Sequence, residues 1–175
     1  MSVITYYFNA YDVGVNEWAN TPENMVDGDT GTEAWTNQNN DVQLLTGNTC
    51  AGTDLGTITK VELRAFGYIS NVSRVALVPV FAGINDGDSH NAITNFTPGA
   101  WSSYFDITED TNAPISWAWS DVQNLDCNVI ATYDSGNLHC YKVEIQVTYT
   151  AVVPPVVIFG SGSQTAKRLL MTMPL

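Results

Sequence analysis

A stretch near the end of the chain decides the fold: Tyr141-Lys142-Val143-Glu144-Ile145-Gln146-Val147-Thr148-Tyr149. Its odd-numbered positions are apolar or aromatic, and its even-numbered positions are polar. Successive side chains of a β-strand point to opposite faces, so this period of two is typical of a strand with one buried face and one exposed face. We therefore predict a half-buried strand over 141–149.

The same alternation appears in an earlier stretch, residues 58–69. There Val61 and Leu63 would point one way, and Lys60 and Glu62 the other. Other segments rich in β-branched and aromatic residues also have the length of strands. We predict these further strands at 3–11, 75–81, 103–107, 115–119 and 127–133.

Turn-forming residues separate the predicted strands. The cluster Asp134-Ser135-Gly136-Asn137 lies between 127–133 and 138–149, which predicts an antiparallel hairpin. Pro79 predicts that 75–81 is an edge strand or carries a bulge, because proline cannot donate a hydrogen bond to the ladder.

Helical periodicity is limited to one short turn, predicted over 120–125 with Ser120 or Asp121 as its cap. Many short strands with polar turns and so little helix indicate an all-β fold. We expect an antiparallel β-sandwich of jelly-roll type over residues 1–150. An extended C-terminal arm over 151–175 would follow it, because two consecutive prolines at 154 and 155 enforce an extended chain.

Two interpretations of this arm remain open. It is either a last strand with a frayed terminus or a segment that docks on a neighbouring subunit. The second interpretation follows from an apolar run, a Gly/Ser linker over 160–163, and a basic pair that the acidic body would attract. On this interpretation the subunit contacts are Val156, Val157, Ile158, Phe159, Lys167, Arg168, Leu169 and Leu170.

Acidic residues dominate the charge of the chain. Its 175 residues include 6 Lys and Arg against 18 Asp and Glu, a net charge of −12. Only 14% of the residues are charged, whereas 45% are hydrophobic and 11% aromatic, which predicts a folded chain rather than a disordered acidic one. Binding to nucleic acid or to an anionic membrane needs clusters of Lys and Arg, so we expect neither partner.

The sequence contains no recognised catalytic constellation. A nucleophilic triad needs a histidine base, and neither His90 nor His139 lies in a motif of that kind. Most acids outside the strands lie in turns, where solvent exposure is the usual state, so no opposed carboxylate pair of a glycosidase can be assigned. We therefore expect a protein that is not an enzyme.

One loop, residues 23–35, concentrates acids, threonines and glycines ahead of a tryptophan. Calcium takes about six to eight oxygens from carboxylates, carbonyls and hydroxyls. Asp27, Asp29 and Thr32 could supply several of these oxygens. The alternative is a tight Asp-Gly turn that is closed by side-chain hydrogen bonds and holds no metal.

This loop resembles the N-terminal loop of discoidin-like sandwiches and related carbohydrate-binding modules. Their loop carries an Asn-x-x-Asp-Gly-Asp-x-x-Thr-x-x-Trp pattern and often holds calcium, and the segment from Asn24 to Trp35 matches it. In that family an acidic residue of a late strand often completes the calcium shell, and Glu144 stands at the matching place. The resemblance implies a discoidin-like sandwich with a structural Ca²⁺ ion held by Asn24, Asp27, Asp29, Thr32 and Glu144.

The tryptophans divide into core and surface candidates. Trp117 and Trp119 share a face by strand periodicity, so we expect both in the core. Trp101 follows Pro98-Gly99-Ala100 and is the best candidate for an exposed ring that stacks on a sugar.

Cys127 and Cys140 flank the predicted hairpin. They would form either a disulfide across adjacent strands or two buried thiols, because a disulfide needs a geometry that the sequence does not establish.

A second resemblance runs from Asn24 to Thr150. The order of the segments NMVDGDTGTEAW, ITKVELRAFGYI, SWAWSDVQNLDCNVIA and YKVEIQVTYT is similar to that of sandwich proteins encoded among tailed-phage virion genes. It implies a non-enzymatic virion structural protein, a capsid decoration or fibre subunit at the surface of the bacteriophage particle. Such a protein would form homo-oligomers or bind a capsid or tail protein.

The alternative function is that of a discoidin-type carbohydrate-binding module with a structural calcium ion. In that case Trp101 would lie in the sugar site, and the partner would be a glycan.

Overall fold

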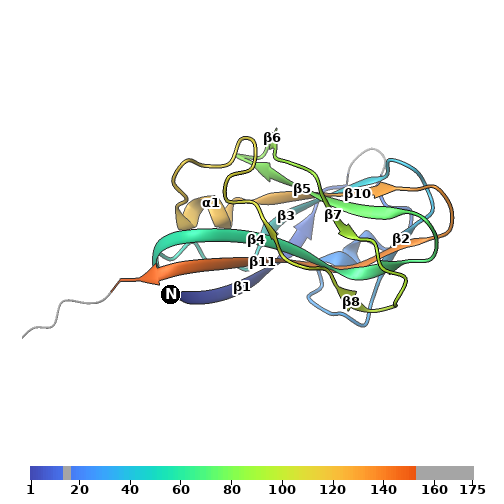
Figure 1. Ribbon diagram of the computed structural model, residues 1–175, viewed down its shortest axis with the longest axis horizontal. Coiled ribbons are helices and arrows are strands. Elements are labelled where there is room, and N and C mark those ends of the chain that lie inside the picture. Colours follow the sequence, from blue (N-terminus) through green and yellow to red (C-terminus); the bar gives the residue numbers. More distant parts are fainter. Residues whose placement is uncertain (14–16, 153–175) are drawn as a thin grey trace, which may run out of the picture.

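The computed structural model describes residues 1–13 and 17–152 (Figure 1). The described chain folds as the predicted all-β antiparallel sandwich, with two layers of strands and only two short helices. No helix in these ranges is long and apolar enough to cross a membrane. The predicted subunit contacts lie outside the described residues: Val156, Val157, Ile158, Phe159, Lys167, Arg168, Leu169 and Leu170.

The first sheet is built around two long strands, β4 and β11, which pair along almost their whole length. The first half of β1 pairs with β11 on its other side, up to Tyr7. Short strands complete the sheet at the edges of β4 and β11. The bounds are β1 (Ser2–Tyr11), β2 (Ala34–Thr36), β4 (Gly56–Ile69), β8 (Ala100–Trp101), β9 (Phe105–Asp106) and β11 (Leu138–Ala151).

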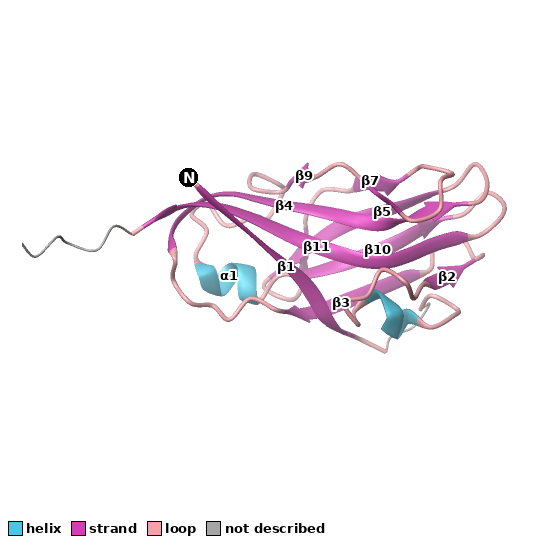
Figure 2. Cartoon of the chain, turned by 90° about the horizontal axis from the view of Figure 1, so that it is seen from below, coloured by secondary structure: helices cyan, strands magenta, loops and turns pink. Residues whose placement is uncertain are grey.

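The second sheet continues from the same first strand, because β1 pairs with β3 from Phe8 onward. The strands run in the order β6-β5-β10-β3-β1-β11-β4-β8, so β1 links the two layers (Figure 1). The bounds in this sheet are β3 (Val42–Asn48), β5 (Arg74–Phe81), β6 (Asn85–Asp86), β7 (His90–Ile93) and β10 (Asp126–Thr132). Figure 2 shows the two helices at opposite ends of the sandwich, α1 (Trp119–Gln123) and the 3₁₀ helix η1 (Pro22–Met25).

The core lies between the two layers and follows the period of two. Val143, Ile145 and Val147 of β11 are fully buried, as are the alternate residues of β10. All three cysteines are free, buried thiols, which agrees with the second interpretation of Cys127 and Cys140. Burial raises the pKa of the Cys140 thiol to about 12, so this side chain packs as a neutral apolar group.

The predicted hairpin between 127–133 and 138–149 is wrong. β10 pairs with β3 and β5, whereas β11 pairs with β1, β2 and β4, so the loop between them crosses from one layer to the other. The carbonyl of Asn137 in that loop accepts a hydrogen bond of 2.9 Å from the amide of Ser70, next to β4. Alternation shows which face of a strand is buried. It does not show whether two strands are hydrogen-bonded in one sheet or lie opposite each other in different layers, because both arrangements give the same pattern.

Two further predicted elements differ from the structure. No strand forms over 115–119, because α1 begins at Trp119 and the preceding residues form bends and loop. The strand predicted over 103–107 is reduced to the two residues of β9. The helical turn predicted over 120–125 is present as α1, but its cap is Ala118, whose amide donates to the Asp121 carboxylate at 2.8 Å.

Pro79 avoids the ladder in a way that the sequence does not predict, because β5 has partners on both sides and its register shift lies at Val75 and Ala76. On one side of β5 it lies opposite Cys127 of β10, and on the other side it falls in the gap between the ladders of β6 and β7. Its carbonyl faces that gap and accepts a hydrogen bond of 2.8 Å from Gly87. The missing N–H of proline therefore removes no bond from a continuous ladder.

Candidate functional site: the outer face of the first sheet

The outer face of the first sheet is rich in aromatic side chains. On β4, Leu63 and Ala65 are fully buried in the core. Side chains alternate along a strand, so Arg64, Phe66 and Tyr68 point to the opposite, outer face, where each is half-buried.

Neighbouring strands add rings to the same face. Trp101 of β8 lies directly opposite Phe66, and His139 of β11 lies directly opposite Tyr68. On the other side of β11, Trp35 of β2 lies opposite His139. Residues that face each other across an antiparallel ladder share a face of the sheet, so all these rings belong to one surface.

Tyr141 reaches this surface because of a β-bulge. The ladder between β11 and β4 shifts register between Cys140 and Lys142, which leaves Tyr141 as an extra residue. Its ring centroid lies 5.4 Å from that of Phe66 and 6.4 Å from that of Tyr68. The period of two predicts Tyr141 on the buried face of the strand, and the bulge places it on the outer face instead.

We call Trp101, Phe66, Tyr141 and Tyr68 the aromatic strip. The centroids of Trp101 and Phe66 are 5.0 Å apart, with the rings tilted by 57°. At the other end Tyr68 stacks in parallel on His139, with 4.1 Å between the centroids. Each ring thus contacts the next, so the rings are held in fixed orientations by their neighbours.

Arg64 supports the Trp101 end of the aromatic strip. Its guanidinium carbon lies 3.9 Å from the centroid of Trp101 and 4.4 Å from that of Tyr104, so two rings contact one cation. Its Nε and one terminal nitrogen bond the Glu144 carboxylate at 3.0 and 2.7 Å. Burial raises the pKa of Tyr104, and the positive charge of Arg64 acts in the opposite direction.

Lys142 is the second cation on this face. Its Nζ lies 3.3 Å from the Glu144 carboxylate and 4.6 Å from the ring centroid of Tyr7. Glu144 is buried, with 8% of its surface exposed, so one shielded carboxylate balances Arg64 and Lys142 together.

Glu33 brings an acidic group to the Tyr68 end of the aromatic strip. Its Oε2 lies 3.1 Å from Nδ1 of His139, close but poorly aligned for a hydrogen bond. Burial raises the pKa of Tyr141, and the negative charge of the nearby Glu33 carboxylate adds to the rise. Burial lowers the pKa of His139 and Glu33 opposes that shift, so the imidazole is neutral at pH 7.

The loop that the sequence singles out for calcium closes on its own hydrogen bonds. The Asp27 carboxylate accepts bonds from the amide of Asp29 and the hydroxyl of Thr32, and Asp29 accepts one from Gly31. Asn24 donates to the Glu33 carbonyl at 2.8 Å, which ties the start of the loop to its end.

Glu144, the fifth proposed calcium ligand, is bonded to Arg64 in this structure. Among the described residues, no three His, Cys, Asp or Glu side chains gather in a metal-binding group. Hydroxyls, amides and carbonyls also bind calcium, so calcium binding by the loop stays a prediction.

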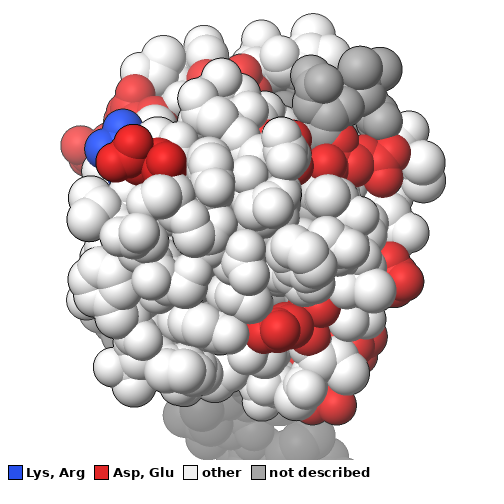
Figure 3. All heavy atoms as spheres, turned by 90° about the vertical axis from the view of Figure 1, so that its right-hand side faces the viewer, with Lys and Arg blue, Asp and Glu red and all other residues white. Residues whose placement is uncertain are grey.

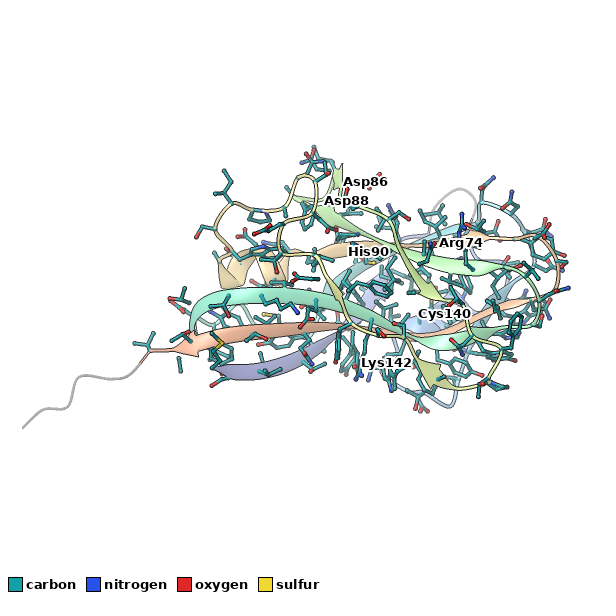
Figure 4. The ribbon with its side chains drawn as sticks, viewed as in Figure 1. Arg74, Asp86, Asp88, His90, Cys140 and Lys142 are labelled. Atoms are coloured by element: carbon teal, nitrogen blue, oxygen red, sulfur yellow. The ribbon has the colours of Figure 1, made fainter. Side chains whose placement is uncertain are left out.

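A second polar cluster lies away from the aromatic strip. Figure 4 shows Asp86, Asp88 and His90 on the side of β6 and β7, and Lys142 on the opposite side of the ribbon. His90 bonds the Asp110 carboxylate at 2.8 Å, and the Asp88 carboxylate bonds the hydroxyl of Thr111 at 2.9 Å. These contacts fasten the loop that precedes α1 to the second sheet.

A shallow hollow of about 500 Å³ lies at the α1 end of the sandwich. Gly56 and two tryptophans, Trp117 and Trp119, are among its lining residues. Both indole N–H groups are bonded to backbone carbonyls, Trp117 to Thr108 and Trp119 to Gly56. Trp119 is buried in the core, as predicted, whereas Trp117 is only partly buried and packs against the edge of the core; the strand that would place both on one face does not form.

Trp101 can be proposed as a site residue from the sequence, but the residues around it cannot. The alternation over 58–69 places Arg64 on the polar face of a strand and says nothing more of it, and Phe66, Tyr141 and Glu33 are not predicted as site residues. One signal was present, because the outward positions of 58–69 change from charged at Lys60 to aromatic further along. Successive aromatic residues on the solvent face of a strand form a contiguous exposed patch, and such a patch indicates a contact surface.

Comparison with known proteins gives little further information. No family model matches the chain, and no curated protein matches it. Among solved structures, a fucose-binding module of Streptococcus pneumoniae is similar with a TM-score of 0.39 and 17% sequence identity, over 80% of this chain and 88% of that one.

Proposed function

We propose that this protein is a non-enzymatic binding module that holds a carbohydrate on the outer face of its first sheet. The observation that carries the proposal is the aromatic strip, in which Trp101, Phe66, Tyr141 and Tyr68 contact one another on a solvent-facing sheet surface.

The chemistry of this surface suits a sugar ring. A pyranose presents apolar C–H groups on its faces and hydroxyls at its edge. Half-buried aromatic rings bind the C–H groups, and flanking polar side chains pair with the hydroxyls. Here Arg64 flanks one end of the strip, and Glu33, the more exposed of the two, flanks the other. Because each ring is braced by its neighbours, little ordering is needed when a ligand binds.

The virion role implied by the second resemblance stays a prediction of its own. A capsid decoration or fibre subunit that binds glycans is compatible with the aromatic strip. Its oligomer contacts were predicted in 156–170, outside the described residues, so the proposal of carbohydrate binding rests on the sandwich alone.

Calorimetric titration with soluble oligosaccharides tests carbohydrate binding. We expect at least one sugar to bind saturably, and Trp101→Ala to weaken that binding about tenfold or more, because a stacking ring is lost. Trp117→Ala is the matched control: it removes the same side chain from a half-buried site that packs on Phe81, away from the strip.

Three results would count against the proposal. One is the absence of binding across gluco-, manno-, galacto- and N-acetylglucosamine oligosaccharides and their anionic counterparts. Another is binding that Trp101→Ala leaves unchanged. The third is equal loss in Trp101→Ala and Trp117→Ala, which would trace the effect to stability rather than to the strip.

A further inference from the structure

Every described cation on the outer face of the first sheet already has an acidic partner. Lys60 lies 2.6 Å from Glu62, and Arg64 lies 2.7 Å from Glu144. Lys142 also contacts Glu144, at 3.3 Å. An anionic ligand would therefore have to compete with a carboxylate of the protein for each of these cations.

The face as a whole is slightly acidic. Lys60, Arg64 and Lys142 supply three positive charges, and Glu33, Glu62, Asp106 and Glu144 supply four negative ones. The chain that surrounds this face carries a net charge of −12. An anionic ligand would be repelled both at the face and at longer range, because the field of the whole molecule has the same sign.

Glu33 is placed to accept hydrogen bonds from a ligand. Its side chain is 34% exposed at the end of the aromatic strip, and its carboxylate lies 3.1 Å from Nδ1 of His139. A carboxylate has about four acceptor positions. His139 makes no aligned hydrogen bond to this carboxylate, so acceptor positions remain that can meet sugar hydroxyls.

We propose that the ligand of this face is an uncharged glycan and that Glu33 accepts its hydroxyl hydrogen bonds at the Tyr68 end of the aromatic strip. The inference rests on the proposed carbohydrate binding and adds the charge class of the sugar and the residue that orients it. Hydrogen bonds to a fixed carboxylate are stronger than those to a neutral acceptor, so Glu33 contributes affinity as well as orientation.

The charge class is tested on the unmodified protein with matched sugars. Calorimetry compares neutral galacto-oligosaccharides with oligogalacturonate and with sulfated galactan oligosaccharides, each at low and high salt. We expect a neutral sugar to bind at least tenfold more tightly than its anionic counterpart, with little effect of salt on the neutral one. An anionic sugar that binds as tightly, and more weakly at high salt, would overturn the inference.

The role of Glu33 is tested by Glu33→Gln, which keeps the shape of the side chain and removes its charge. We expect the affinity for the neutral sugar to fall about fivefold or more. Glu23→Gln is the matched control, since Glu23 is an exposed acid of the same loop in η1 and should leave binding unchanged. Equal affinities of Glu33→Gln and the unmodified protein would overturn the assignment of Glu33.

The two proposals fail in different ways. One possible result is that an anionic sugar binds tightly and that Trp101→Ala abolishes this binding. This result would overturn the proposal of an uncharged ligand but would support carbohydrate binding. The absence of binding by every sugar, neutral or anionic, overturns both. Because the sugar comparison uses the unmodified protein, it remains decisive even if Glu33→Gln lowers the melting temperature.

Discussion

At the scale of single residues, His139 links the aromatic strip to stability. Its imidazole is buried with 7% of its surface exposed, stacks on Tyr68, and lies beside Glu33. Burial lowers its pKa below the ordinary value of 6.5, although the Glu33 carboxylate acts in the opposite direction. The folded protein therefore keeps His139 neutral at a pH where the unfolded chain protonates it.

This shift predicts that His139 reduces stability on acidification. As pH falls through about 6.5, the unfolded state gains a proton that the folded state does not bind, so the free energy of unfolding decreases until the folded pKa is reached. Well above about pH 6.5 His139 is neutral in both states, so its contribution to the free energy of unfolding is constant there. Thermal melts from about pH 7.5 to about pH 5.5 should show a falling melting temperature, with a shallower slope in His139→Gln. Equal slopes in the two proteins would contradict the prediction.

At the scale of elements, the bulge in β11 decides which residues reach the outer face. It lies where β11 passes Gly67 of β4, which faces Cys140. A Cβ atom at Gly67 would lie 2.2 Å from the His139 carbonyl oxygen and 2.5 Å from the Ile93 side chain. Only glycine allows this close approach of the two backbones, and the approach permits the local geometry that turns Tyr141 outward.

Gly67→Ala is accordingly expected to destabilise the protein strongly, because the contact at 2.2 Å is with backbone that cannot rotate away. We expect a loss of about 1–3 kcal/mol or more, measured by denaturant unfolding. Gly83→Ala is a useful comparison, since a Cβ there meets nothing within 4 Å and only the strain of its φ of +74° remains. A Gly67→Ala variant no less stable than Gly83→Ala would refute this role of Gly67.

The positions of most long strands could be predicted from the sequence, but their partners could not. Alternation located β1, β4, β5, β10 and β11 closely, because a half-buried strand needs a period of two whatever its partners are. It wrongly predicted that β10 and β11 pair, since facing and paired strands share that pattern. It also misplaced Tyr141, because a bulge interrupts the period, and its local cause, the close approach at Gly67, is a tertiary contact.

For the candidate site, the sequence could predict one ring but not the surface. Trp101 was identified from its own loop, whereas its neighbours Arg64 and Tyr141 come from strands far apart in the chain. The loop for which calcium is predicted lies next to the site. Glu33 is the loop residue that contacts the site, whereas Asp27 and Asp29 bond within the loop. Which side chain of a loop reaches a sheet depends on tertiary packing that residue types do not encode.

At the scale of the whole molecule, charge is sparse and unevenly distributed. Figure 3 shows one end of the sandwich as mostly uncharged surface with separate acidic groups and one small basic group. Of the four described basic side chains, Lys60, Arg64 and Lys142 lie on the outer face of the first sheet, and only Arg74 lies elsewhere. Three of the four described cations therefore lie on the face that carries the aromatic strip, each beside an acidic side chain, which favours an uncharged ligand there.

The indole N–H signals of the ¹⁵N-labelled protein test this account most directly, because its five tryptophans report on different regions. Trp18 and Trp119 are buried and bonded to backbone carbonyls, so they serve as internal references. On titration with a neutral oligosaccharide, we predict that the Trp101 signal shifts and saturates while these two stay in place. An unchanged Trp101 signal, or a shift confined to Trp117 and Trp119 at the α1 hollow, would contradict a carbohydrate site on the outer face of the first sheet.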